Sequence, residues 1–136
     1  MLKGFDVHTA PLTDIERYRL VPALVNILKT AKGKRRAVTN NDIATILKDD
    51  GRRPSSARIR KLINYIRNND LIIGLIATSN GYYIASCEEE LIEYEDSLRG
   101  REEAIKAVRL SIARQRRKLY EGLRQEQTLF NNTNND

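Results

Sequence analysis

Residues 55–85, SSARIRKLINYIRNNDLIIGLIATSNGYYIA, decide the fold that we expect for this chain. Their first half predicts an amphipathic helix, because apolar residues recur at the spacing of a single helical face. These residues are Ile59, Leu62, Ile63 and Ile66. The opposite face carries Ala57, Arg60, Lys61, Asn64 and Asn68, with Arg58, Tyr65 and Arg67 on its flanks. Since residues 51–69 contain no acid, this helix should bury one face and turn positive charge outward.

A tight β-hairpin is expected directly after this helix. Two apolar runs, residues 71–77 and 82–85, flank the sequence TSNG. We expect a two-residue primed turn there, because Asn-Gly supplies the positive φ values that such a turn demands. A basic helix followed by a β-wing is the arrangement expected of a winged helix-turn-helix reader of DNA.

A first helix is expected upstream, beginning at Asp14. Thr13 and Glu16 have the T-x-x-E spacing of a capping box, in which each side chain binds the backbone N–H of the other. Pro22 lacks the N–H that a helix interior requires. It therefore predicts a kink, followed by a main helix that ends near residue 31.

A second helix should follow the cap residue Thr39. Asp42 lies at its third position, where a carboxylate is favoured by the positive end of the helix dipole. Gly51 supplies the stop and Pro54 the restart, so we expect this helix to reach residues 50–51. One of the two serines after Pro54 should cap the next helix. Two helices of about 11 and about 14 residues, joined by a short Gly/Pro turn, fit helix-turn-helix geometry.

Positive charge is concentrated on the segment that holds these two helices. The chain has a formal net charge of +6, but residues 29–70 hold twelve Lys/Arg against four Asp/Glu, a local balance of +8. Clustering of this kind is expected for a protein with a polyanionic partner. A basic face that is merely solvated is the alternative interpretation.

Residues 87–122 predict one long helix. Apolar residues recur there at intervals of seven, at Leu91, Leu98, Ile105, Ile112 and Leu119. The second heptad position is only partly apolar, with Tyr94, Arg101, Val108, Gln115 and Gly122. This pattern is typical of a coiled coil. We therefore expect a homodimer through Leu91, Tyr94, Leu98, Ile105, Val108, Ile112 and Leu119. The alternative is a stripe that folds back on the preceding domain.

The charges of this helix favour one orientation of the dimer. Residues 88–96 hold six acids and no base, whereas the last third carries Arg109, Arg114, Arg116, Arg117 and Lys118. An antiparallel pair would place each acidic end against the basic end of its partner, and a parallel pair would place like charges together. The basic third could instead lie along DNA phosphates. Residues 123–136 are polar, and we expect them to form a disordered tail.

The chain resembles the small winged-helix proteins that phages and prophages encode. The resemblance covers roughly residues 13–110 and is carried by TNNDIATIL, ARIRKLINYIRNN, LIATSNGYYIA and an acidic stretch leading to SLRGREEAI. The elements predicted above give a mainly α protein with a small β-hairpin: an arm at residues 1–12, a winged helix-turn-helix at 13–86, and then the long helix. The resemblance implies a DNA-binding module in a bacterial host cell. By that motif, the groove is read from Ser56, Arg58, Arg60, Lys61 and Asn64.

Double-stranded DNA is therefore the expected partner, bound in the control of transcription or replication. The expected contact residues are basic or carry amides and hydroxyls: Lys34, Arg35, Arg36, Arg53, Ser56, Arg58, Arg60, Lys61, Asn64, Arg67, Asn68 and Asn80. The hairpin tip has neither Arg nor Lys, unlike many winged helices, which weakens the case for a contact there. The alternative is a protein-interaction module, an adaptor or an inhibitor of a host factor. The sequence names neither the DNA target nor the process.

No active site, metal or cofactor is expected. His8 is the only histidine and lies in the arm, and Cys87 is the only cysteine, for which we expect a buried or inert thiol. The acids of residues 88–96 are explained by the helix dipole without a metal ion. No apolar run approaches the ~18 residues that a membrane span requires. Residues 1–6 do not lead into a signal segment, so we expect an intracellular protein.

Overall fold

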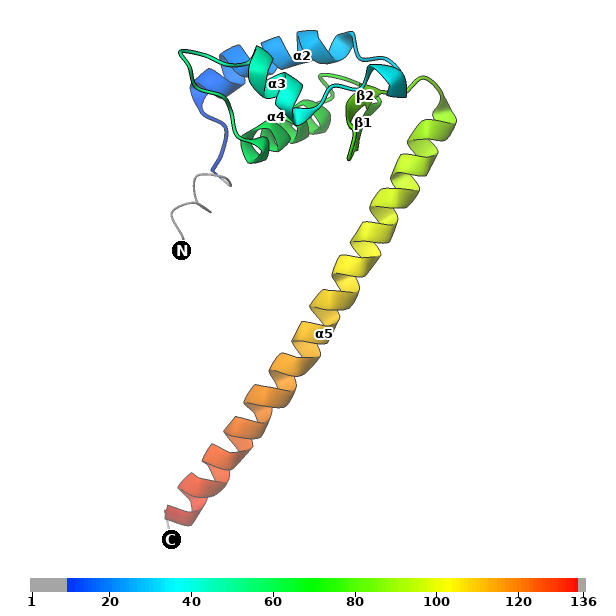
Figure 1. Cartoon of the computed structure of the whole chain (residues 1–136). Helices are drawn as coiled ribbons and strands as arrows, with labels where there is room; N and C mark the ends of the chain where they lie inside the picture. Colours follow the sequence, from blue (N-terminus) through cyan, green and yellow to red (C-terminus); the bar gives the residue numbers. More distant parts are fainter. Residues whose placement is uncertain (1–9, 135–136) are drawn as a thin grey trace. The chain divides into compact units, whose positions relative to one another are not determined.

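The structure, a computed structural model, describes residues 10–134. The chain is mainly helical, with a small antiparallel hairpin and a long C-terminal helix (Figure 1). It divides into two compact units between Ile92 and Glu93. We call residues 10–92 the head. The expected arm at residues 1–9, with His8, lies outside the described residues. The elements are η1 (Glu16–Leu20), α2 (Val21–Lys29), η2 (Lys34–Arg36), α3 (Asn40–Ile46), α4 (Ser56–Asn68), β1 (Leu75–Thr78), β2 (Gly81–Ile84) and α5 (Glu88–Asn134).

The first helix begins at Asp14 as predicted, and its capping box is present. The Thr13 N–H donates to Glu16 Oε1 over 2.9 Å, and the Glu16 N–H donates to Thr13 Oγ1 over 3.2 Å. Pro22 does not split the chain into two separate helices. The wide turns of the π-helix η1 run directly into α2, and the Val21 N–H reaches back to the carbonyl of Glu16. Such wide turns make room for a proline that would clash in a regular α-helix.

Helix α3 begins as predicted and ends early. Thr39 and Asp42 form a reciprocal capping box. The expected end at residues 50–51 is wrong, because α3 stops at Ile46 and a separate tight turn follows. In that turn Asp49 and Arg52 exchange backbone hydrogen bonds, with positive φ at Asp50 (52°) and Gly51 (77°). The connection between α3 and α4 is therefore longer than the short Gly/Pro turn expected from the sequence.

Helix α4 supplies the centre of the head's core, and its predicted apolar face is confirmed. The side chains of Ile59, Leu62 and Ile66 are 0 % exposed. They pack among aliphatic and aromatic residues of α2, α3 and the hairpin, namely Leu24, Leu28, Ile43, Leu47, Leu75 and Tyr82. A fully buried aliphatic side chain contributes about 1.5–3 kcal/mol, so burial fixes which face of α4 points to solvent. The Ser55 side chain caps the helix by accepting from the Arg58 N–H over 3.2 Å.

The hairpin is shorter than predicted and its turn differs. β1 begins at Leu75 because positive φ values at Asp70 (54°) and Gly74 (83°) turn the preceding chain. Thr78 pairs with Gly81, so Ser79 and Asn80 form the loop. The expected primed Asn-Gly turn is wrong: in the described hairpin the positive φ lies at Gly81 (124°), after the loop. The Thr78 hydroxyl closes the turn by donating to the Gly81 carbonyl and accepting from the Asn80 N–H, both over 3.2 Å.

The second edge of β2 is bound by the segment between α2 and α3. Tyr82 exchanges two backbone hydrogen bonds of 2.9 Å with Val38. The Ile84 N–H donates to the Ala31 carbonyl over 2.7 Å, and the Gly33 N–H donates to the Ile84 carbonyl over 2.9 Å. This pairing brings the Val38 backbone so close that a Cβ at residue 81 would lie 2.6 Å from its carbonyl oxygen. Only glycine fits there.

Helix α5 extends further than predicted. It runs to Asn134, whereas a disordered tail was expected from residue 123; of that tail, only residues 135–136 lie outside the described residues. Residues 123–127, LRQEQ, are all strong helix formers, so the helix can continue although its polar sequence offers no face to bury. Cys87, expected to be buried or inert, precedes this helix and is exposed.

Gly81→Ala should lower the free energy of unfolding of the head by about 2 kcal/mol or more, since it adds both backbone strain and a clash with Val38. Gly51→Ala is the matched control. Gly51 also has positive φ, but no described atom lies within 4 Å of the added Cβ, so strain alone should cost about 1 kcal/mol. Urea unfolding followed by near-UV circular dichroism measures both. Equal losses would contradict the close approach of Val38.

Candidate nucleic-acid interface

The outward face of α4 carries the residues that the sequence predicted for it. Arg60, Asn64 and Asn68 are exposed, and Lys61 and Arg67 are half-buried. The Arg60 Nε donates to the Ser56 carbonyl over 3.4 Å, and Arg67 Nη1 donates to Asn64 Oδ1 over 3.5 Å. Both hydrogen bonds lie at the long end of the range, within α4 itself. They hold these side chains against their own helix, with Arg60 exposed and Arg67 half-buried.

One flank of this face is covered by η1. The guanidinium of Arg17 lies over the ring of Tyr65, 5.8 Å from its centroid, which is a cation–π contact. Tyr65 is half-buried as a result. The solvent-facing surface of α4 is therefore centred on Asn64, with Arg60 and Lys61 on either side of it.

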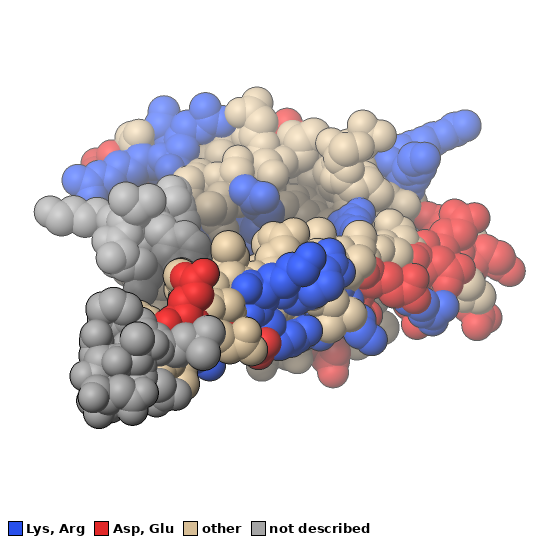
Figure 2. Space-filling view, turned by 90° about the horizontal axis from the view of Figure 1, so that it is seen from below, with Lys and Arg blue, Asp and Glu red and all other residues tan. Residues whose placement is uncertain are grey.

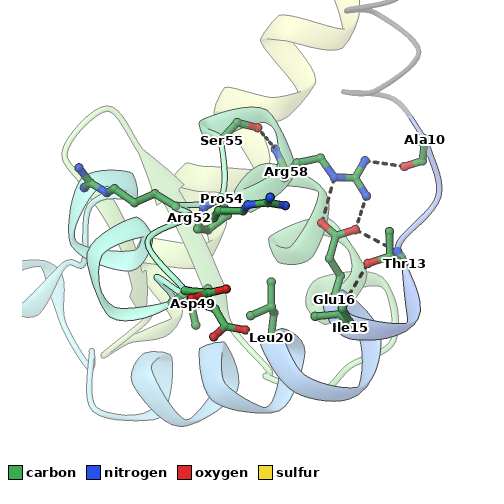
Figure 3. Close-up of a pocket in the computed structure, with 13 residues that line it drawn as sticks. Ala10, Thr13, Ile15, Glu16, Leu20, Asp49, Arg52, Pro54, Ser55 and Arg58 are labelled. Atoms are coloured by element: carbon green, nitrogen blue, oxygen red, sulfur yellow. Dashed lines mark hydrogen bonds and ion pairs between the residues drawn. The ribbon is translucent and has the colours of Figure 1, made fainter.

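Arg58 does not belong to that surface, although the sequence placed it in the DNA-binding set. Its side chain turns toward η1 and meets Glu16 (Figure 3). Arg58 Nε donates to Glu16 Oε2 over 2.9 Å, and a second nitrogen bonds Glu16 Oε1. The remaining donors reach the carbonyls of Ala10 over 2.6 Å and Pro11 over 3.1 Å. Both side chains of the ion pair are nearly buried, so Arg58 joins α4 to the N-terminal segment instead of facing solvent.

Glu16 is thus a member of both a capping box and an ion pair. Burial raises the pKa of its carboxyl, but hydrogen bonds from Arg58 and Thr13 and the charge of Arg58 outweigh this and leave the pKa below its ordinary value of 4.5. The hydrogen bond with Glu16 likewise raises the pKa of Arg58. Sequence reasoning found the cap because its partners are three residues apart. It missed the ion pair because 42 residues separate Glu16 from Arg58.

Arg53 is also engaged by the head. Its Nη2 donates to Asn41 Oδ1 over 2.7 Å and to Thr45 Oγ1 over 2.8 Å, which ties the α3–α4 connection to α3. Its neighbour Arg52, which the sequence analysis did not select, is exposed and lines a pocket together with Asp49, Glu16 and Arg58 (Figure 3). The pocket carries charges of both signs, so it does not extend the basic surface.

The basic triplet Lys34–Arg36 lies in an ordered turn and not in the flexible loop expected from the sequence. The triplet forms the 3-10 helix η2, which contacts β2, and all three of its residues are exposed. Ser56 and Asn80 are exposed as well, Asn80 at the hairpin tip. Figure 2 shows Lys and Arg in several groups on the surface. Apart from Arg58, whose side chain is nearly buried, the predicted site residues therefore remain at least partly exposed, on η2, α4, the hairpin and, for Arg53, the α3–α4 connection.

Cys87 offers no activated nucleophile. A backbone hydrogen bond with Glu90 lowers the pKa of its thiol, but desolvation and hydrogen bonds to the Glu90 and Glu89 carboxylates outweigh it, so the net shift is upward. Within residues 10–134, no group of three or more His, Cys, Asp or Glu is placed to hold a metal ion. Over the same residues, none of the helices combines the length and hydrophobicity needed to cross a membrane.

Comparison with protein-family models, with curated proteins and with solved structures gave no match to this chain.

Glu16→Gln should lower the free energy of unfolding by about 3 kcal/mol, because it leaves the nearly buried Arg58 guanidinium without its counter-charge. Asp49→Asn is the matched control, since it removes an exposed ion pair, Arg19–Asp49 at 3.8 Å, from the same head. We expect that change to cost less than about 0.5 kcal/mol. Urea unfolding at neutral pH measures both variants.

The cost of Glu16→Gln should also depend on pH. The folded-state pKa of Glu16 lies below its ordinary value, so its contribution is complete above pH 4.5 and is lost as the pH falls through the folded-state value. The difference between wild type and variant should therefore stay constant down to pH 4.5 and shrink as the pH falls from there toward about pH 3. A constant difference over this range would show that the carboxylate charge contributes nothing.

Proposed function

We propose that the head is a winged helix-turn-helix domain that binds double-stranded DNA, with α4 as its recognition helix. The observation that carries this proposal is the outward face of α4. One side of the helix is locked into the core by Ile59, Leu62 and Ile66, and the other presents Arg60 and Asn64 to solvent. These side chain types pair with guanine and adenine edges in the major groove.

The order and pairing of the elements support this assignment. Helices α3 and α4 contact each other and are followed by the β1–β2 hairpin, as recognition helices are followed by a wing. The second edge of β2 pairs with Val38 and Ala31, so the hairpin is anchored to the rest of the head through β2. The arrangement would place the hairpin tip, with Asn80, beside the groove that α4 enters.

The surface cations divide into two roles under this proposal. Arg60 and Asn64 lie in the second and third turns of α4, on its exposed face, from which side chains reach base edges. Lys34, Arg35 and Arg36 lie apart from α4, on η2, and are suited to phosphate contacts. Arg58 takes no part, because its donors are occupied by Glu16 and by two backbone carbonyls.

The resemblance to phage and prophage winged-helix proteins adds a setting: control of transcription or replication inside a bacterial cell. A protein-interaction module is the second reading of the same fold. The basic face favours DNA, because residues 51–69 contain no acid. Failure to bind duplex DNA would favour the interaction module.

Binding of duplex DNA should depend steeply on salt. With about five phosphates neutralised, log K should fall with log salt at a slope of about −4 to −5. Fluorescence polarisation with a random-sequence duplex at about 50 mM and about 200 mM salt measures this slope. Absence of binding at the lower salt concentration would remove the proposal.

Arg60→Ala should relax sequence preference, because a bidentate contact with guanine is worth about 1–3 kcal/mol of discrimination. Arg35→Ala removes the same charge from η2 and should weaken binding to all sequences about equally. Selection from a pool of random duplexes, performed with wild type and both variants, compares their preferences. If the two variants lose affinity without any change in preference, α4 does not read bases.

A further inference from the structure

The long helix α5 carries an apolar stripe that the chain leaves exposed. In the first seam of the stripe, defined by Leu91, Leu98, Ile105, Ile112 and Leu119, the exposed fractions of Ile105, Ile112 and Leu119 are 70 %, 58 % and 64 %. The second seam consists of Tyr94, Arg101, Val108, Gln115 and Gly122. Its Val108 side chain is 62 % exposed. A continuous apolar stripe on an otherwise polar helix is the signature of a surface that another helix covers.

We propose that a second copy of this chain covers the stripe, with the two α5 helices paired antiparallel. The charges beside the seams select this occupant. Four of the five residues that directly follow the second seam are charged, and they form a flanking column along one side of the stripe: Glu95, Glu102, Arg109 and Arg116. All four side chains are exposed. The column is acidic in its first half and basic in its second. Its charges therefore complement those of an identical column that runs in the opposite direction.

In an antiparallel pair, the flanking columns of the two helices lie on the same side of the seam and face each other. The acidic half of one column then meets the basic half of the other. Glu102 faces the partner's Arg109, and Glu95 faces the partner's Arg116. Two-fold symmetry repeats each contact, so every member of the column gains an opposite charge.

A parallel pair lacks these contacts. There the flanking column faces the residues that precede the first seam, which are Glu90, Ser97, Ala104 and Ser111. Glu95 would lie beside Glu90 of the partner, and Arg109 and Arg116 would face Ala104 and Ser111. The parallel arrangement therefore has one repulsive contact and no ion pair from the same residues.

The antiparallel alignment also places large apolar residues of the two seams against each other. It places Ile105 against Val108 of the partner at the centre, and Leu119 against Tyr94 of the partner toward each end. The polar residues of the second seam, Arg101 and Gln115, are long enough to cover apolar neighbours with their stems while their ends reach water. The mixed seam weakens the pair relative to a fully apolar one, so dimerisation in the micromolar range is expected.

Charge reversal tests the pairing. Sedimentation equilibrium of the wild-type chain should give a dimer at tens of micromolar. Glu102→Arg places an arginine against the partner's Arg109 at each of the two symmetry-related contacts, and it should raise the dissociation constant about tenfold or more. The double variant Glu102→Arg, Arg109→Glu exchanges the charges and should restore wild-type dimerisation. Far-UV circular dichroism of each variant checks that α5 stays helical.

The adjacent Glu103 provides the control. It has the same charge and is also exposed, but it lies on the side of the helix away from the seams. Glu103→Arg should therefore leave the dissociation constant unchanged. A monomeric wild type would overturn the proposal and favour a stripe that folds back on the head. Equal effects of the Glu102 and Glu103 substitutions, or a double variant that fails to recover, would overturn the antiparallel register.

The native cysteine measures the orientation directly. Cys87 is exposed and precedes α5, and it is the only cysteine of the chain. In the antiparallel dimer it lies opposite Glu126, so two Cys87 residues are about 60 Å apart at a rise of 1.5 Å per residue. In a parallel dimer they would be neighbours. Pulsed electron–electron double resonance between spin labels on the two Cys87 residues should give this long distance. A short distance between the labels would overturn the proposal. The measurement does not depend on DNA binding.

Discussion

Burial of one face of α4 is the constraint from which the rest of the head follows. Ile59, Leu62 and Ile66 are 0 % exposed, and residues of α2, α3 and the hairpin pack around them. Because a helix that buries aliphatic side chains on one side must present its other side to solvent, the same packing sets the direction of Arg60 and Asn64. The packing that forms the core therefore also orients the basic face. A rotation of α4 about its axis would expose isoleucines and bury amides at once.

The ion pair between Glu16 and Arg58 restrains α4 against rotation about its axis and against sliding along its length. It acts at the first turn of α4, and its other partners are the carbonyls of Ala10 and Pro11. A nearly buried ion pair adds little net stability relative to apolar packing, but it is costly to break on one side only. Its role here is to fix the position of α4. Arg58 is withdrawn from the basic face, and its ion pair holds the helix that carries Arg60 and Lys61.

The two units use charge in different ways. In the head, residues 51–69 contain no acid, which favours an external polyanion. On α5, acids and bases are segregated along one column, which favours the reversed copy of the same helix. These two proposals are compatible, because they draw on separate residues. Together they describe a DNA-binding head attached to a dimerising helix, although each stands or falls by its own measurements.

Sequence alone determined the features that depend on neighbours in the chain. The capping boxes at Thr13 and Thr39 and the buried face of α4 follow from spacings of three or four residues, and all are present. The tertiary structure decided what depends on distant partners. Gly81 is required because Val38 approaches it from another segment, and Arg58 leaves the basic face because Glu16 lies within reach after folding. Local periodicity carries no information about which side chains distant segments bring together, and that is the physical limit of the sequence pattern.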